Sequence, residues 1–435
     1  MAHSPETAAL EASAGPAPGV RRSFLRRRRR RGGGGAGIAY TIWLILPVVG
    51  SALIDLPRER RAGPMTWLGI LTIMQIVLAS GMFLAAGTYP RRLLRALLPL
   101  AALGAWACAT LLWTEPAPDA WPTALAYLQL GMLVAAAGAV AALEPVRVRE
   151  VLDRAVLAFD VIGLSIAGAS IASHGLAIMT WPVHPRAIAL AAIAPVSWHA
   201  AQWYDGRRAA LIPVILWLSV AIASLSRTAT GTLVAVLLLV LALRSLATPP
   251  SSERRATMWL LGVVAGAMLA AGGLPQFRER LFVEDRLELW AGVATSALRA
   301  PLVGQGLGSS ESSPVLRYWY VQPPAVDPRP HPWHEYWWVH PHNELLRAFH
   351  DLGIPGALLL AAALGGWIGT LAAGWRRLRP HREEPSRLIV GALLATAGLA
   401  MAMMTDNPIV YPFVVGPLAV LIGAGLGAVS RTADL

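Results

Sequence analysis

The sequence predicts an all-α protein that crosses a membrane about twelve times, because three features of the chain agree. Apolar residues make up 55% of its 435 positions, and the mean hydropathy is +0.52. Apolar runs long enough to span a bilayer recur from position 38 onward. Arginines gather in the polar links between these runs, which is typical of links that face the cytoplasm.

The predicted segments follow one another along the chain. A basic tail occupies 1–37, and the first nine predicted spans occupy 38–273. A long polar loop fills 274–343, three more spans fill 344–428, and a short tail covers 429–435. The individual spans are expected near 38–54, 65–86, 96–113, 122–143, 155–173, 187–204, 209–225, 228–246, 256–273, 344–373, 387–405 and 408–428.

The placement of arginine predicts the orientation. The 37 basic residues include no lysine, and a cytoplasmic tail at 21–31 puts most later arginine clusters on the same side. The exception is 58–61, which carries its own acid. Both termini are then cytoplasmic and the loop 274–343 lies outside. The net charge of +12 orients the chain and attracts anionic membrane lipids. It does not indicate a nucleic-acid partner, since no folded basic domain is predicted.

The long loop is expected to carry function, because it concentrates aromatic rings that favour the membrane surface. Its tryptophans include Trp290, Trp319, Trp333, Trp337 and Trp338. Helical spacing of apolar residues predicts a short interfacial helix over 284–298 that carries Arg286 and Trp290 on one face. The loop is therefore interpreted as a lid on the bilayer. The single cysteine, Cys108, lies in an apolar span and is expected to be buried.

A histidine-led turn enters the tenth predicted span. His342 and Asn343 are followed after nine residues by Gly353 and then by Gly356. Upstream, Pro301–Gly306 reads Pro-Leu-Val-Gly-Gln-Gly, and Arg227 ends a Ser-Leu-Ser-Arg run between two apolar segments. Together these motifs resemble the signatures of the bacterial O-antigen ligases, within a wider ligase and polymerase family.

The resemblance implies a polytopic C-type glycosyltransferase of the bacterial inner membrane, with a periplasmic active site. The donor would be an undecaprenyl-pyrophosphate-linked O-antigen, the acceptor the lipid A core oligosaccharide and the product lipopolysaccharide. His342 would remove the acceptor proton, while Arg227 and Arg286 would stabilise the departing pyrophosphate. The residues assigned to substrate binding are Asn343, His340, Arg347 and Trp290. Gly353 and Gly356 are expected to allow close helix packing, and Pro355 a bend.

No metal or other cofactor is expected. The histidines at 331, 334, 340, 342 and 350, with Glu335 and Asp351, do not follow the spacing of a compact zinc motif. The sequence also lacks an Asp-x-Asp pair of the kind that holds a metal beside a sugar nucleotide.

Other functions stay open at this point. An O-antigen polymerase and a protein O-oligosaccharyltransferase would use the same donor, although the His-Asn-x9-Gly-x2-Gly spacing favours the ligase. A twelve-helix transporter would give similar hydropathy, but its long central loop is usually cytoplasmic and divides two halves.

Overall fold

The computed structural model describes residues 61–62, 65–87, 89–114, 120–174, 185–224, 226–247, 284–312, 341–378 and 386–432, with positions 255 and 259. All of these residues belong to one compact unit, Trp43–Leu435. The predicted tail 1–37 and span 38–54 lie outside the described residues, as do almost all of the span 256–273 and much of the loop 274–343.

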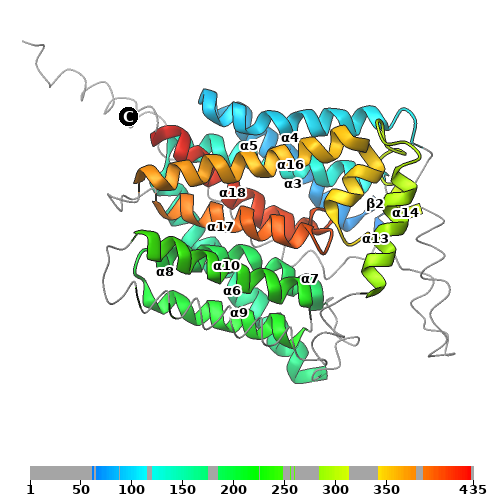
Figure 1. Ribbon diagram of the computed structural model, residues 1–435. Helices are drawn as coiled ribbons and strands as arrows, with labels where there is room; N and C mark the ends of the chain where they lie inside the picture. Colours follow the sequence, from blue (N-terminus) through cyan, green and yellow to red (C-terminus); the bar gives the residue numbers. More distant parts are fainter. Residues whose placement is uncertain are drawn as a thin grey trace, which may run out of the picture. The chain divides into compact units, whose positions relative to one another are not determined.

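Helices make up nearly all of the described elements (Figure 1). Two short strands, β1 (Arg61–Ala62) and β2 (Met65–Thr66), pair antiparallel before the first described helix. The first group of helices is α3 (Trp67–Ala86), α4 (Arg91–Thr110), α5 (Ala120–Leu143), α6 (Pro145–His174), α7 (Pro185–Ala191), α8 (Ile193–Tyr204), η2 (Arg208–Ala210), α9 (Leu211–Ala223) and α10 (Arg227–Ala247). The second group is α13 (Glu284–Ala297), α14 (Ser309–Ser312), α16 (Glu344–Leu378), α17 (Ser386–Met403), η4 (Pro408–Val410) and α18 (Pro412–Thr432).

Seven of the described helices are long and apolar enough to cross a membrane: α4, α5, α6, α10, α16, α17 and α18. The segments Thr72–Ala86 and Arg208–Ala223 are shorter apolar helices. Each predicted span within the described residues coincides with helical structure, which confirms the all-helical prediction. The seven candidate spans are consistent with a multi-pass membrane protein. The segment predicted as one span over 187–204 is divided at Ala192 into α7 and α8.

Large apolar side chains remain exposed on the outward faces of these helices, as lipid contact requires. Examples are Leu84, Leu98, Leu157 and Ile212, which are each more than half exposed. Cys108 is also exposed, so the expectation of a buried thiol was wrong. Hydropathy identified its helix, α4, but could not tell which face of that helix turns outward.

The centre of the fold is α18, whose apolar side chains are buried against α5 and α17. Glycines bring α18 and α5 into backbone contact. A β-carbon at Gly423 would lie 2.3 Å from the carbonyl oxygen of Val134, and one at Gly427 would lie 2.1 Å from that of Gly138. Small residues at this spacing let membrane helices approach closely.

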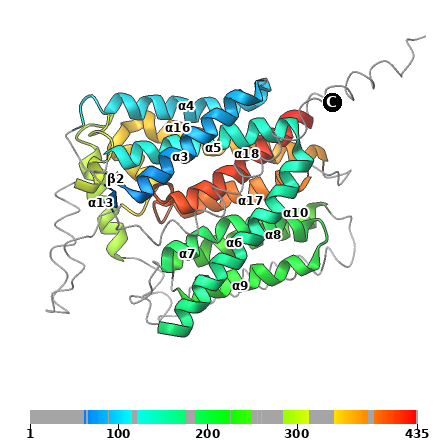
Figure 2. The same ribbon diagram turned by 180° about the vertical axis from the view of Figure 1, so that it is seen from behind.

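Helix α16 packs against α4 on one side and α17 on the other (Figure 1). Helices α13 and α14 lie at the end of α16 where that helix begins, and both contact it (Figures 1 and 2). Helices α6 to α10 gather on the other side of α17 (Figure 2). The start of α16 and the end of α17 therefore lie among segments that are remote in the sequence.

Candidate active site

The first turn of α16 is fixed by its own capping residue. The Asn343 side-chain oxygen accepts a hydrogen bond from the backbone amide of Leu346 at 3.0 Å, which is the usual role of an asparagine before a helix. His342, immediately before this cap, has a φ of 52°. Few residues with a β-carbon adopt this left-handed conformation, although histidine does so more often than most. The imidazole is partly exposed, with 22% of the side chain accessible.

The loop between α17 and η4 meets the start of α16. The Asn343 side-chain amide donates to the carbonyl of Met404 at 3.3 Å. The carboxylate of Asp406 lies 3.5 Å from Nδ1 of His342. Asn407 donates from its side-chain amide to Glu344 at 3.0 Å. The loop 404–407, which lies far away in the sequence, thus contacts three successive residues at the start of α16, namely 342–344.

The start of α10 reaches the same loop. Ser226 caps α10 by accepting from the amide of Ala229 at 3.3 Å. Thr228 donates to the carbonyl of Thr405 at 3.3 Å and accepts from its hydroxyl at 3.1 Å. Arg227 precedes Thr228 and is exposed, so the first residue of α10 is an arginine next to the segment that contacts the loop holding His342.

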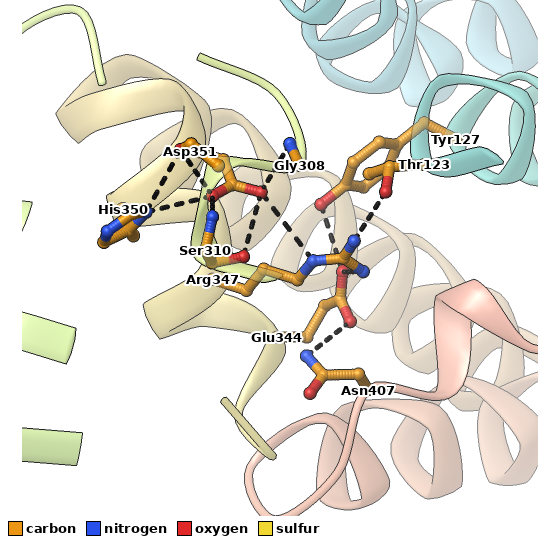
Figure 3. A network of polar contacts seen from close by, with 10 residues as sticks. Thr123, Tyr127, Gly308, Ser310, Glu344, Arg347, His350, Asp351 and Asn407 are labelled. Atoms are coloured by element: carbon orange, nitrogen blue, oxygen red, sulfur yellow. Dashed lines mark hydrogen bonds and ion pairs between the residues drawn. The ribbon is translucent and has the colours of Figure 1, made fainter. Parts of the chain in front are cut away.

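A buried charged network lies beneath this surface (Figure 3). Arg347 is 0% exposed, and its guanidinium lies 3.9 Å from the carboxylate of Glu344 and 3.8 Å from that of Asp351. It also donates to the hydroxyl of Thr123 in α5. Tyr127, one turn further along α5, donates to Glu344 at 3.1 Å. The network ties the first turns of α16 to α5, and the opposite charges offset the cost of burying each one.

Asp351 anchors the turn that leads into α14. Its carboxylate accepts from the amides of Gly308 and Ser310 at 3.0 and 2.8 Å, and from the hydroxyls of Ser309 and Ser310 at 3.2 Å each. An ionised carboxylate with this many donors is well satisfied in the interior. Asp351 was noted in the sequence as a possible metal ligand. In this structure its oxygens accept hydrogen bonds from the backbone amides of the turn.

Ser296, His350 and Asp351 are connected in the order found in serine hydrolases. Nε2 of His350 lies 3.1 Å from the hydroxyl of Ser296, and Nδ1 lies 3.0 Å from the carboxylate of Asp351. His350 is 0% exposed and Ser296 only 4%, so a substrate has no access to either group. The arrangement therefore joins the end of α13 to α16 and does not form a second catalytic centre.

Gly353 breaks α16, with φ 71° and ψ −170°. The amide of Ile354 turns away from the helix and donates to the carbonyl of Pro301 at 2.8 Å. Pro355 has no amide hydrogen, so it cannot satisfy the carbonyl of Asp351. The carbonyls before the break accept from outside the helix: His350 from the Gln305 amide at 3.0 Å, Asp351 from the Gly306 amide at 3.0 Å, and Leu352 from the Trp106 indole at 2.8 Å.

The two glycine motifs fit against each other at this break. A β-carbon at Gly304 would lie 2.3 Å from the carbonyl oxygen of Asp351, and one at Gly306 would lie 2.4 Å from the hydroxyl of Thr114. Both glycines also have positive φ angles. Glycine is therefore required here by backbone contact as well as by conformation. The structure gives these glycines a packing role, whereas Gly356 faces the side chain of Leu352 across the kink.

Helix α13 confirms the helix predicted over 284–298, with its end at Ala297. Leu289 and Val293 are buried and pack with Leu346, so this part of the predicted interfacial face contacts α16. The indole of Trp290 donates to the carbonyl of Pro341 at 2.9 Å. Arg286 lies in the first turn of α13, and its side chain is outside the described atoms, as is all of His340.

The structure therefore brings together His342, Asn343, Trp290 and the start of α10 that carries Arg227. It does not place the Arg347 side chain where a substrate could touch it, because that side chain is fully buried. Sequence reasoning missed Asp406, although the signal was present. Asp406 stands between the last two apolar runs, where a charge is costly unless it has a partner.

No group of three or more histidine, cysteine, aspartate or glutamate side chains within the described ranges is arranged to hold a metal ion. The histidines at 331, 334 and 340 lie outside those ranges. The candidate site contains a histidine–carboxylate pair, His342 and Asp406, beside an arginine-bearing helix start. These groups are suited to proton transfer and anion binding.

Residues 212–361 match a family model described as O-antigen ligase. The matched segment runs from α9 into α16 and includes Arg227, Arg286, His342, Asn343 and Gly353. Asp406 lies beyond it. No curated protein matches the chain significantly.

Proposed function

We propose that this chain belongs to the O-antigen ligase family, whose model matches residues 212–361, and that it completes lipopolysaccharide. As a member of that family it would be a glycosyltransferase-like membrane enzyme of glycan ligation. In our proposal, the protein transfers O-antigen from undecaprenyl pyrophosphate to the lipid A core oligosaccharide. The observation that carries the proposal is the contact between His342 and Asp406 beside the start of α10.

The proposed reaction is a displacement at the anomeric carbon of the donor. A hydroxyl oxygen of the acceptor forms a bond to that carbon, while the bond from the carbon to the pyrophosphate oxygen breaks. The electron pair of the broken bond leaves with undecaprenyl pyrophosphate, and the hydroxyl proton passes to His342. No nucleotide is required, because the lipid pyrophosphate already serves as the leaving group.

The position of Asp406 supports histidine as the base. A carboxylate beside Nδ1 favours the tautomer that carries its proton there, which leaves the basic electron pair on Nε2. The carboxylate also stabilises the imidazolium that forms when the acceptor proton arrives. Asp406 thus acts through His342 as a positioning and electrostatic partner, in addition to the residues that the family resemblance implies.

Arginines are proposed to hold the pyrophosphate. The planar guanidinium presents paired donors that match phosphate oxygens, and both negative charges of the leaving group need stabilisation as the bond breaks. Arg227 is exposed at the edge of the loop that holds His342, and Arg286 is proposed to approach from α13. We assign Arg347 to positioning, because its buried guanidinium is engaged by α5 and by its own helix.

The proposed setting is the bacterial inner membrane, with about twelve spans, both termini in the cytoplasm and the site facing the periplasm. The arginine pattern of the sequence supports this orientation, as does the lipid-linked donor. Asn343 and His340 are proposed to lie beside the bound substrates, as the family resemblance implies. Reaction without a metal or other cofactor is part of the proposal, so ligation by the purified enzyme should survive EDTA.

Deletion of the gene tests the function as a whole. Gel analysis of lipopolysaccharide should show loss of the long-chain bands, and lipid-linked O-antigen should accumulate at full length. An O-antigen polymerase would instead leave single repeat units on the core. A protein O-oligosaccharyltransferase would leave the lipopolysaccharide unchanged and remove glycan from proteins.

A further inference from the structure

We propose that Trp290 is a positioning residue that holds His342 in its left-handed backbone conformation. The inference rests on the proposed role of His342. It goes further by making α13 part of the mechanism that orients the histidine. It also replaces the substrate contact that the sequence suggested for Trp290.

The argument begins with the peptide plane between Pro341 and His342. The φ angle of His342 is the rotation about its N–Cα bond, which turns that plane relative to the rest of the residue, and it stands at 52°. The Trp290 indole donates to the carbonyl oxygen in the first plane at 2.9 Å. A hydrogen bond at this oxygen opposes rotation of the plane, which is the motion that would let His342 relax to a more favourable φ.

The peptide after His342 is fixed independently. The Asn343 side chain caps α16 through Leu346 and donates to the carbonyl of Met404. With Trp290 on one side and Asn343 on the other, His342 is the link between two anchored peptides. Its Cα–Cβ bond is thereby aimed toward Asp406, whose carboxylate lies 3.5 Å from Nδ1.

The indole itself is held at a fixed place on α16. Leu289 and Val293, on the same face of α13, are buried against Leu346. At the end of α13, Ser296 contacts the buried imidazole of His350. Helix α13 is thus joined to α16 at two points, both before the kink at Gly353, and Trp290 can act as a rigid support for Pro341.

The test compares Trp290→Phe with Trp121→Phe in the full-length purified enzyme, using lipid-linked O-antigen and lipid A core. Phenylalanine keeps a ring at position 290 but removes the donor. Trp121 lies on α5 and is 68% exposed, so its replacement controls for loss of an indole. We expect kcat of Trp290→Phe to fall by roughly 10- to 100-fold, with KM for both substrates within about twofold of wild type, since small misplacement of a reacting group has effects of this size. Trp121→Phe should keep wild-type values.

A raised KM with unchanged kcat would assign Trp290 to substrate contact and overturn the inference, and so would wild-type kinetics. If Trp290→Phe fails to fold, benzothienylalanine at position 290 provides the same test. It keeps the shape of the indole and replaces only the N–H group with sulfur. The wild-type enzyme and His342→Ala separate the two proposals. A wild-type enzyme that transfers no O-antigen refutes the proposed function, and an active His342→Ala enzyme refutes the proposed base. An inactive His342→Ala enzyme together with a normal Trp290 variant refutes the positioning role alone.

Discussion

The backbones of Gly304 and Gly353 lie in direct contact, although one belongs to the turn after α13 and the other to α16. A β-carbon at Gly304 would lie 2.6 Å from the amide nitrogen of Gly353, and one at Gly353 would lie 2.8 Å from that of Gly304. The glycine of the Pro-Leu-Val-Gly-Gln-Gly turn and the glycine after the His-Asn motif are therefore each required because the other segment packs directly against it. The contact fixes the turn that Asp351 anchors and sets where α16 breaks below His342.

Replacing Gly353 by alanine should destabilise the protein by roughly 2–4 kcal/mol, because the new methyl group meets backbone atoms at a φ that alanine disfavours. The melting temperature in detergent measures the change. Gly366→Ala is the matched control in the same helix, since nothing lies within 4 Å of a β-carbon there. Equal melting temperatures for the two variants would show that the kink tolerates a side chain.

Replacing His342 by alanine should abolish ligation while donor binding persists, because the proposed role is proton removal in the transition state. His342→Gln should be nearly as inactive, since glutamine can keep a hydrogen bond but cannot take a proton. The expected loss is about 3 to 5 kcal/mol of barrier, or about 10²- to 10⁴-fold. Turnover and donor binding are measured at matched protein levels. Near-normal turnover by His342→Gln would mean that the histidine only positions the acceptor.

Replacing Asp406 by asparagine should lower kcat by about 10- to 100-fold, or about 1.4 to 2.7 kcal/mol of barrier, because it removes the negative charge that lies 3.5 Å from Nδ1 of His342. The amide cannot stabilise the imidazolium and can face Nδ1 with its own donor. Asp205→Asn is the control, because it removes a carboxylate from an ion pair with Arg387 at the opposite end of α17. A similar kcat for Asp406→Asn and wild type would show that Asp406 does not contribute to the reaction.

Replacing Arg227 or Arg286 by lysine should weaken ligation about tenfold or more, because lysine keeps the charge but loses the paired donors that grip a phosphate. The loss should include a higher KM for the lipid-linked donor. Arg147→Lys serves as control, since Arg147 forms an exposed ion pair with Glu144. Wild-type kinetics in both test variants would place pyrophosphate recognition on other residues.

The proposed orientation predicts that position 333 faces the periplasm and position 379 the cytoplasm. Trp333→Cys and Arg379→Cys are introduced separately into Cys108→Ala, because Cys108 is exposed on α4 and could react itself. An impermeant thiol reagent applied to intact cells should label only the first variant. Labelling of position 379 but not of position 333 would show the opposite orientation and would contradict a periplasmic site.

Hydropathy predicted where helices such as α5, α10 and α17 run, because each contains an apolar run long enough to cross a membrane. It could not predict which remote segments meet. The contact of Asp406 with His342 depends on the packing of α17 beside α16, and the burial of Arg347 depends on α5. A histidine and an arginine in one motif look equally available to a substrate in the sequence. The fold exposes part of the histidine and encloses the arginine.

The sequence predicted a bend at Pro355, whereas α16 breaks at Gly353. The proline accounts for only part of this break. Proline withholds one amide, but the break persists because an external turn supplies the missing donors. That compensation depends on residues 301–306, which precede the motif by a long stretch of chain. Local sequence could therefore indicate a bend and not its geometry.

The hydrogen bonds that α16 accepts from other segments just before Gly353 limit how this protein could be recombined with related sequences. The carbonyls of His350, Asp351 and Leu352 depend on donors from 305–306 and from Trp106. A chimera that takes the start of α16 from one parent and the glycine turn from another risks leaving the carbonyl oxygens of buried residues without a hydrogen-bond donor. Residues 301–310 and 344–356 are thus expected to be inherited as a single module, even though they are separated along the gene.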